Sequence, residues 1–246
     1  MSFGQGELPE APLQGRVILV VGAGGGLGAS AAQACAQAGA TVVLLGRRLS
    51  RLNRVYDAVA AAGPEPLIYP LDLEGATPDD YAEMAQRIEA ALGRLDGVLH
   101  CAADFHGLTP AQAADPAHFA RALHVNLTAR AWLTQACLPL LKVREDAAVV
   151  FVVDDPARVG QAYWGGYGAA QYGVRGLLDS LHDELKSGPV RVAGLMPGPM
   201  RTALRARAFT HHEDTQALPA AAWAGACVDL LGEQGQQWRG QVRTTP

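Results

Sequence analysis

Tyr167 is the side chain of this sequence whose surroundings most suggest proton transfer. Gln171 follows it by four residues, so the two side chains are expected to share one face of a helix. A free tyrosine has a pKa of about 10, which leaves about one part in 10³ ionised at neutral pH. Asp154 stands thirteen residues before Tyr167, and a nearby carboxylate raises a tyrosine pKa further. Tyr167 is therefore expected to be a protonated phenol that can donate a proton but seldom accepts one.

A glycine cluster at positions 22–28 is the second feature with a chemical meaning. It follows a short apolar run, Arg16–Val21, and opens an Ala-rich helical pattern, Leu27–Ala38. Glycines let the backbone turn tightly and present amide N–H groups to a pyrophosphate at a helix N-terminus. A flexible loop is the alternative, but the strand before and the helix after favour dinucleotide binding.

The elements that must position these residues alternate along the chain. Further strands are expected over 41–45, 67–71, 96–101, 147–153, 190–195 and 239–243, and helices over 50–62, 78–92, 116–141 (one or two helices), 166–186 and 219–231. Nearly continuous apolar strands separated by helices indicate a parallel sheet covered on both faces. The expected fold is α/β, a doubly wound, Rossmann-like sheet of about seven strands.

The length of 246 residues suits a single domain with a large core. Residues 1–14 are expected to form a flexible N-terminal arm, and residues 15–246 one dinucleotide-binding and catalytic domain. Residues 198–218 are irregular and follow a strand at the sheet edge where open α/β sheets bind ligands. They are interpreted as a substrate lid.

Composition excludes several classes of partner. The net charge is −4 with no block of basic residues, so nucleic acid and anionic membranes are poor candidates. The sequence has no apolar run near the length of about 18 residues that a membrane helix needs, and its start does not resemble a signal peptide. Four cysteines, far apart and without a C-x-x-C pair, fit a reducing compartment, so a cytoplasmic location is expected.

Several motifs, in order and at matching spacing, resemble the short-chain dehydrogenase/reductase family over almost the whole chain. The glycine turn has the spacing G-x-x-x-G-x-G. Asp72 follows the third expected strand, Leu99–Ala103 replaces Asn-Asn-Ala-Gly, and Asn126 and Tyr167 match an asparagine and the catalytic tyrosine. Pro197–Thr202 matches P-G-x-x-x-T, which holds the nicotinamide amide in that family. The expected cofactor-binding residues are Gly22, Gly26, Leu27, Gly28, Arg47, Asp72, Leu73, Ala102, Pro197, Gly198 and Thr202.

The end of the second strand bears on which nicotinamide cofactor is used. An NAD site would place a carboxylate near Gly46, and the sequence has none there. Arg47 could instead meet a 2′-phosphate, because guanidinium groups match phosphate geometry. NADP(H) is therefore favoured over NAD(H), the alternative being that Arg47 and Arg48 simply begin a solvated helix.

The resemblance implies four catalytic positions, of which two are altered. The tyrosine moves the proton, a lysine lowers its pKa and holds the ribose, a serine binds the substrate oxygen, and an asparagine supports a water relay. This chain keeps Tyr167 and Asn126 but has Gln171 for the lysine and Asp154 for the serine. Gln171 supplies no positive charge, and a carboxylate at Asp154 has the wrong sign for an oxygen that gains negative charge.

These changes predict reduced or altered activity. Alcohol oxidation needs a tyrosinate and should suffer more than carbonyl reduction, which needs a phenol. We expect an NADP(H)-dependent oxidoreductase that acts on a small carbonyl or alcohol. The alternatives are a non-catalytic dinucleotide-binding sensor and a structural subunit, which would make the chain a pseudoenzyme.

Other candidates have simpler interpretations. Cys101, Ala103 and Val21 replace an asparagine, a glycine and a threonine near the cofactor, and Cys101 is interpreted as a small filler rather than a reactive thiol. Three lid arginines could recognise an anionic substrate, but a solvent-facing turn is favoured (Arg201, Arg205 and Arg207). His211–Asp214 has metal-ligand types, but a solvated loop is favoured and no metal site is expected.

Glycines recur along the expected helix that carries Tyr167, at positions 166, 168, 173 and 176. Small residues allow helices to approach closely. In the resembled family this helix often packs across a subunit interface, so a homodimer or homotetramer is expected.

Overall fold

A seven-stranded parallel sheet forms the centre of the computed structural model, which describes residues 11–209 and 217–244. The spatial order is β3-β2-β1-β4-β5-β6-β9. The strands are β1 (Val17–Val21), β2 (Thr41–Gly46), β3 (Leu67–Pro70), β4 (Gly97–His100), β5 (Ala147–Val152), β6 (Val190–Met196) and β9 (Val242–Thr244). The predicted doubly wound α/β fold is confirmed, with most strand bounds within one or two residues of the expected ones.

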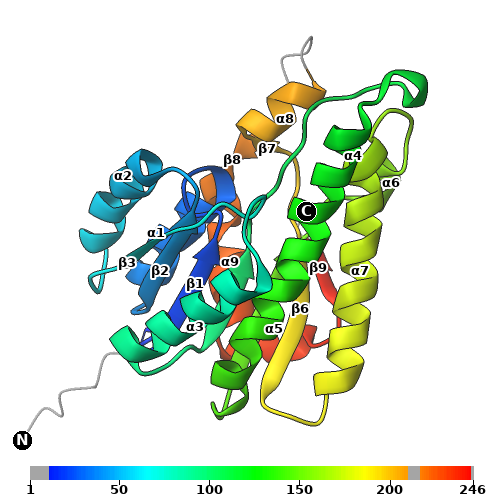
Figure 1. Cartoon of the computed structure of the whole chain (residues 1–246). Coiled ribbons are helices and arrows are strands. Elements are labelled where there is room, and N and C mark those ends of the chain that lie inside the picture. The colour runs from blue at the N-terminus through cyan, green and yellow to red at the C-terminus, as the bar shows by residue number, and fades with distance from the viewer. Residues whose placement is uncertain (1–10, 210–216, 245–246) are drawn as a thin grey trace, which may run out of the picture.

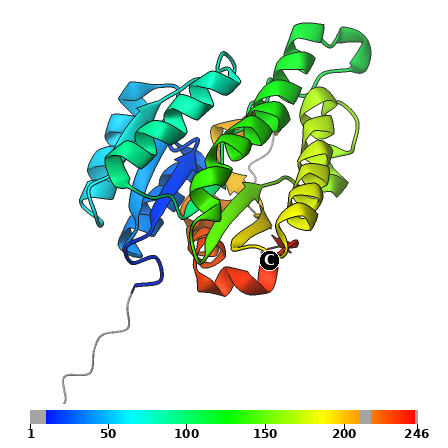
Figure 2. The ribbon, with the colours of Figure 1, turned by 60° about the horizontal axis from the view of Figure 1, so that its bottom comes forward.

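Helices cover both faces of the sheet (Figures 1 and 2). One face packs against α1 (Gly26–Gln37), α2 (Leu49–Ala60) and α9 (Ala224–Leu231). The other face packs against α3 (Pro78–Leu92), α5 (Ala129–Lys142) and α7 (Gly165–Leu185). Alternate residues of β1 point to opposite faces, which is why every one of its side chains is buried.

The strand order reverses between β1 and β4, and this reversal positions the site. From β1 the chain proceeds outward to β2 and β3, then returns to β4 on the other side of β1. Val21 lies in register with both Leu45 and His100, so these three strands end at one edge. Ligands of open α/β sheets bind outside the carboxyl ends of the strands at such a reversal.

The segment predicted as helix over 116–141 is divided in a way that matters for the site. It forms α4 (Pro116–Leu123), a π-helical turn (His124–Thr128) and then α5. The wider turn buries Asn126 completely. Single π-turns inside α-helices are frequent at functional sites.

The predicted lid and the helix after it differ in detail from expectation. Within 198–218 the described residues include β7 (Met200–Arg201) and α8 (Ala203–Ala208), so the segment is partly regular. β7 pairs with β8 (Leu218–Pro219), and α9 begins only at Ala224 after a 3₁₀ turn. The predicted helix start at Pro219 is wrong because that residue is in a strand.

The end of the predicted N-terminal arm packs against the domain. Residues 1–10 lie outside the described residues. Leu13 is fully buried, and its N–H donates to the Ala38 carbonyl at 2.8 Å. The chain is therefore anchored to α1 before β1 begins. In the described part of the chain, no helix is long and apolar enough to cross a membrane.

Three glycines of α7 pack closely against other elements of this same chain. A Cβ at Gly166 would lie 2.8 Å from the Phe119 carbonyl oxygen of α4. A Cβ at Gly173 would lie 2.6 Å from a methyl group of Leu127. Gly168 is as closely packed against the short helix α6 (Pro156–Val159). Gly166, Gly168 and Gly173 are thus explained within the fold, whereas a Cβ at Gly176 would meet nothing within 4 Å among the described residues.

Candidate active site

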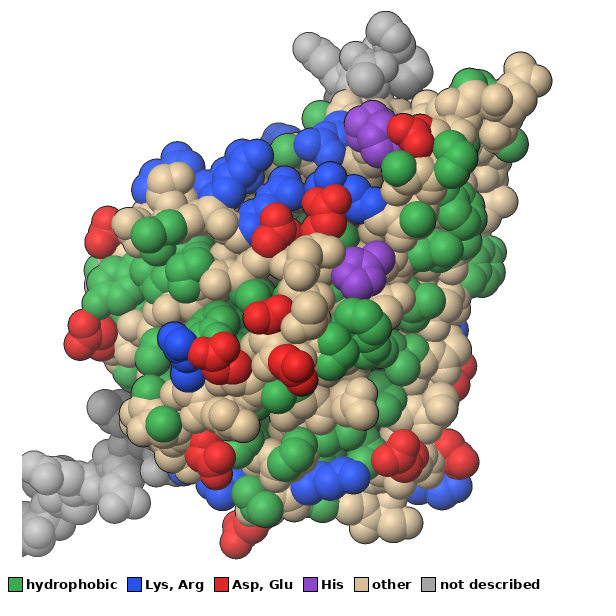
Figure 3. Space-filling model, viewed as in Figure 1, with side chains coloured by type: hydrophobic (Ala, Val, Ile, Leu, Met, Phe, Trp, Pro, Cys, Tyr) green, Lys and Arg blue, Asp and Glu red, His purple; other side chains and the backbone are tan. Residues whose placement is uncertain are grey.

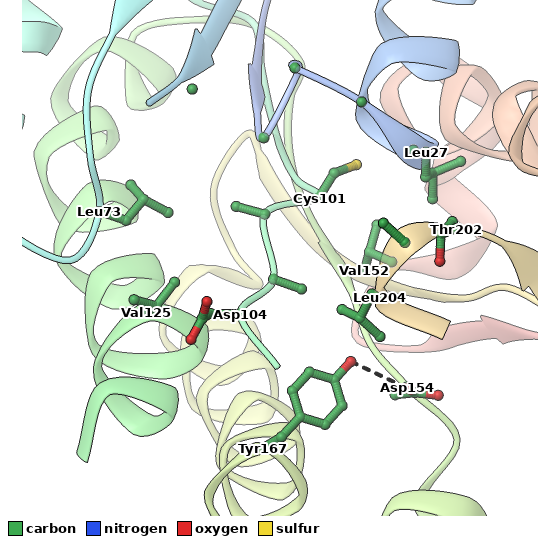
Figure 4. A pocket seen from close by; sticks show the side chains of 18 of the residues that line it. Leu27, Leu73, Cys101, Asp104, Val125, Val152, Asp154, Tyr167, Thr202 and Leu204 are labelled. Carbon is green, nitrogen blue, oxygen red and sulfur yellow. Dashed lines mark hydrogen bonds between the residues drawn. The ribbon is translucent and has the colours of Figure 1, made fainter. Parts of the chain in front are cut away.

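A cavity of about 380 Å³ opens at the carboxyl ends of the central strands (Figure 4). This volume falls in the range of about 300–1,000 Å³ that ligand pockets occupy. It brings together most of the residues predicted from the sequence, namely Gly22, Gly26, Leu27, Arg47, Asp72, Leu73, Ala102, Asp154, Tyr167, Gln171, Pro197, Gly198 and Thr202. The cavity lining does not include Gly28 or Asn126, which lie behind the wall.

The glycine turn between β1 and α1 has the geometry of a phosphate cradle. Gly22 and Gly26 have φ of 90° and 55°, a left-handed conformation that favours glycine. A Cβ at Gly22 would lie 2.6 Å from the Ala102 backbone nitrogen, and Gly28 packs directly against the Gly22 carbonyl. Among the described residues, no side chain caps the start of α1 at Gly25. Its first amide N–H groups are therefore available to an anion.

Basic side chains line the cavity where β2 ends. Arg47, Arg48 and Arg51 belong to this wall, and the Arg51 side chain lies beside Gly24. Figure 3 shows Lys and Arg side chains gathered along the upper edge of the molecule between α2 and α8. Asp72 lies on the same wall, where its carboxylate accepts the Glu74 N–H at 3.2 Å. Arginines rather than a carboxylate thus follow the second strand.

Tyr167 and Asp154 meet at the opposite end of the cavity (Figure 4). The Tyr167 hydroxyl donates to Asp154 Oδ2 at 3.2 Å, and the tyrosine is 6% exposed. Burial and the Asp154 carboxylate raise the pKa of Tyr167 well above its ordinary value, while Arg130 and Arg158 partly oppose this rise. The expected direction of the tyrosine pKa is thus found, but its first cause is burial, which the sequence spacing does not reveal.

Asp154 is held by three donors. Besides the Tyr167 hydroxyl, it forms an ion pair with Arg158, and the Asp155 N–H donates to Asp154 Oδ1 at 2.8 Å. Asp155 also caps α6, because its side chain accepts the Ala157 N–H. Sequence reasoning missed Arg158, although its spacing of four from Asp154 across a helix start was a usable signal.

Gln171 lies on the same face of α7 as Tyr167, as predicted, and is 5% exposed. Its Oε1 accepts the Asp154 backbone N–H at 3.0 Å. This bond ties α7 to the segment that follows β5. Gln171 also lines the cavity, and among the described residues its amide Nε2 has no hydrogen-bond acceptor, so it remains a donor for a ligand.

Asn126 uses its side chain to hold the loop after β4. Its Nδ2 donates to the carbonyls of Asp104 at 2.7 Å and Ala122 at 2.8 Å. Its Oδ1 accepts the Asp104 N–H at 2.9 Å. Asp104 in turn is paired with Arg121. In this structure Asn126 positions the loop over the cavity rather than facing the cavity itself.

Arg130 is a lining residue that sequence reasoning missed. The residue is 2% exposed, and its two terminal nitrogens donate to the carbonyls of Val152 at 2.8 Å and Ala102 at 2.7 Å. The signal was present, because Arg130 is the only Lys, Arg, Asp or Glu between Arg121 and Lys142. A charge inside an otherwise apolar helix is rarely without a role.

Aromatic and aliphatic side chains close the cavity beside Tyr167. The ring of Phe105 lies 5.0 Å from that of Trp164 and 5.2 Å from that of Tyr167, measured between centroids. Leu204 and Phe209 pack against this cluster. The substrate side of the cavity is therefore largely apolar, which no motif in the sequence indicated.

The cysteine and the lid arginines that the sequence singled out have structural explanations. Burial raises the pKa of the Cys101 thiol to about 12, which fits a filler and not a reactive thiolate. Arg207 donates to the Phe105 carbonyl at 2.6 Å, Arg205 stacks over the Phe209 ring, and Arg201 is exposed. The segment 211–214 lies outside the described residues. Within the part of the chain that the structure describes, no group of side chains has the composition of a metal site.

Fold and site together define a Rossmann-type protein with a cavity at the carboxyl ends of its central strands. Residues 16–213 match the family model described as short chain dehydrogenase. The uncharacterized oxidoreductase YciK of Escherichia coli K12 is 39% identical over 207 residues, which cover 84% of this chain and 81% of that protein.

Solved structures agree with this match. A short-chain dehydrogenase from Pseudomonas syringae has a TM-score of 0.91 at 40% identity, covering 97% of each chain. A short-chain dehydrogenase from Escherichia coli CFT073, complexed with NADPH, has a TM-score of 0.91 at 35% identity, covering 96% of this chain and 99% of that chain. The chain belongs to the short-chain dehydrogenase family, a class of oxidoreductases.

Proposed function

We propose that this protein is an NADP(H)-dependent oxidoreductase that reduces a small carbonyl compound, with Tyr167 as the proton donor. The observation that carries the proposal is the buried Tyr167 hydroxyl at one end of a cavity whose other end is the glycine turn. A phenol with a raised pKa is an acid and not a base at neutral pH. This favours carbonyl reduction over alcohol oxidation.

NADP(H) fits the residues at the binding end. The amide groups at Gly22–Gly28 suit the pyrophosphate, and Arg47 suits the 2′-phosphate. Pro197–Thr202 would hold the nicotinamide amide, as the family resemblance implies. When bound, NADPH supplies the hydride. A family member of similar fold has been solved with NADPH, which supports the same choice here.

The residues of this chain then have defined tasks. The apolar cluster around Phe105 and Trp164 excludes water and accepts a small apolar substrate. Tyr167 gives its proton to the substrate oxygen as that oxygen gains negative charge, and solvent restores the proton afterwards. Asp154, neutralised by Arg158, orients the hydroxyl through the bond that they share. Gln171 would bind the ribose hydroxyls of the cofactor through its amide.

The test is NADPH oxidation by the purified protein with a panel of small aldehydes and ketones. We expect turnover in the wild type, and a loss of about 10² to 10⁴ in kcat on Tyr167→Phe without loss of NADPH binding. Tyr172→Phe is the matched control, because Tyr172 lies on the same helix and is 55% exposed. Turnover that survives Tyr167→Phe contradicts the assignment of Tyr167.

A dinucleotide-binding sensor is the second candidate, favoured by the full engagement of Asp154 with Arg158 and the Asp155 N–H. Calorimetry separates the candidates. NADPH binding without turnover of any carbonyl supports the sensor, and no binding of NADP(H) or NAD(H) leaves a structural subunit. A homodimer or homotetramer is also proposed, and light scattering of the eluted protein tests it.

A further inference from the structure

The floor of the cavity contains a buried positive charge that does not come from the family's lysine position. Arg130 projects from α5, one helical turn after Asn126. Its guanidinium joins the carbonyl of Ala102, just past β4, to the carbonyl of Val152 at the end of β5. Both partners line the cavity, as Arg130 does. The charge therefore lies under the cavity and not on its rim.

Arg130 has carbonyl partners but no carboxylate partner among the described residues. Its Nε is also buried without a hydrogen-bond acceptor. Arg191 offers a contrast within the same fold. It is 1% exposed, but it forms a two-pronged pair with Asp146 at 2.7 and 3.0 Å. A buried cation without a counter-ion is costly, so its retention at a cavity calls for an explanation from function.

The surroundings of Arg130 supply that explanation. Gln171 brings no charge, and its Oε1 is occupied by the Asp154 N–H. Arg158 is paired with Asp154. Arg130 is thus the cation near Tyr167 that a carboxylate does not neutralise within the described site. Its effect is opposite to that of Asp154, because it lowers the pKa of Tyr167.

We propose that Arg130 is a positioning residue that takes over, from α5, the positive charge that the family's lysine supplies from α7. The proposal rests on the proposed function. The guanidinium donates to the Val152 carbonyl and lines the same cavity as Tyr167. Figure 4 shows the side chains of Val152 and Tyr167 in that cavity. There the guanidinium stabilises the negative charge that develops on a substrate oxygen during reduction.

The same charge has a consequence for the cofactor. The oxidised nicotinamide ring is positively charged and the reduced ring is neutral. A fixed cation in a poorly solvated floor disfavours the oxidised ring by Coulomb repulsion. We expect this chain to bind NADPH more tightly than NADP⁺, so that Arg130 and the protonated Tyr167 both favour reduction.

Two substitutions separate charge from hydrogen bonding. Arg130→Lys and Arg130→Gln both lose the two-pronged guanidinium and keep a shorter donor, but only lysine keeps the charge. The measurement is the Kd of NADP⁺ divided by the Kd of NADPH, by calorimetry, with thermal unfolding as the test of folding. We expect a ratio above one in the wild type, similar in Arg130→Lys, and lower by about threefold to tenfold in Arg130→Gln.

A double variant tests whether a positive charge on α7 can replace the one lost from α5. Arg130→Gln/Gln171→Lys places a cation at the family's position, and we expect the Kd ratio and the rate of carbonyl reduction to recover. Arg191→Gln is the control for loss of a buried arginine, because it lies at the opposite end of β6 from the cavity and should lower stability without changing the ratio.

The outcomes are distinguishable. Equal weakening of NADPH and NADP⁺ in Arg130→Gln, with an unchanged ratio, shows that Arg130 only joins two strands and overturns the inference while the proposed function stands. A ratio at or below one in the wild type overturns it without any variant, even if Arg130→Gln does not fold. A wild-type protein that binds neither form overturns the proposed function and the inference together.

Discussion

The two ends of the cavity are built by different means. At the binding end the backbone of the glycine turn comes first, with a wall of arginines after β2 beside it. The reaction end is made by side chains. There Asp154 raises the pKa of the Tyr167 hydroxyl, and Arg130 and Arg158 lower it. We therefore expect the binding end to tolerate little change in backbone shape. We expect the reaction end to tolerate exchange of residues as long as the sum of the charges suits Tyr167.

The largest effect is expected from a change at the binding end. Gly22→Val forces a side chain against the Ala102 nitrogen and onto a φ of 90°. We expect loss of NADPH binding by more than about 10²-fold and a cost of about 2–4 kcal/mol in the free energy of unfolding. Calorimetry and urea unfolding measure the two effects.

The control for Gly22→Val is Gly176→Ala, on the open side of α7 and outside the cavity, where a Cβ meets nothing within 4 Å. Alanine should stabilise that helix by about 0.5–1 kcal/mol. Wild-type affinity for NADPH in Gly22→Val would show that the turn does not hold the dinucleotide.

The next effect belongs to the reaction end. Asp154→Ser/Gln171→Lys removes a negative charge beside Tyr167 and adds a positive one, so the tyrosine pKa should fall. We expect alcohol oxidation with NADP⁺ to rise by about tenfold to 10²-fold, and carbonyl reduction to rise less. Initial rates in both directions with one substrate pair measure this asymmetry. An unchanged ratio of the two rates means that the charges at these two positions do not limit proton transfer.

The sequence predicted the binding end of the cavity better than the reaction end. The doubly wound parallel sheet and the place of Gly22, Arg47 and Thr202 at one cavity could be predicted, because glycine patterns and strand ends are local signals. The bond between Gln171 and the Asp154 backbone N–H, and the carbonyls bound by Arg130, could not. They depend on which side chains meet across β4, β5, α5 and α7, and no spacing in the chain encodes that contact.

A smaller effect is expected on the preference of the protein for NADPH over NADH. Arg47→Gln removes the guanidinium after β2 but leaves Arg48 and Arg51 on the same wall. We expect NADPH to bind about tenfold more weakly, with NADH unchanged, because a charged hydrogen bond to phosphate contributes about 1.5–3 kcal/mol and the remaining arginines compensate in part. Competition between the two nucleotides measures the preference. Equal weakening of both would place Arg47 away from the 2′-phosphate.

The smallest effect is expected from pH, because the rate of carbonyl reduction should hardly change with it. In the proposed function Tyr167 is the acid in reduction, so we expect activity while the phenol is protonated and its loss only as the pH rises through the pKa of Tyr167. Burial and Asp154 raise that pKa above the ordinary value of about 10. We expect kcat for carbonyl reduction to change less than about twofold between pH 7 and pH 10, where a free tyrosine would be half ionised. A single-turnover rate at saturating NADPH measures it, with folding checked at each pH. A fall in rate with a midpoint below pH 9 would mean that the cations outweigh burial at this hydroxyl, and Arg130→Gln should then move the midpoint upward.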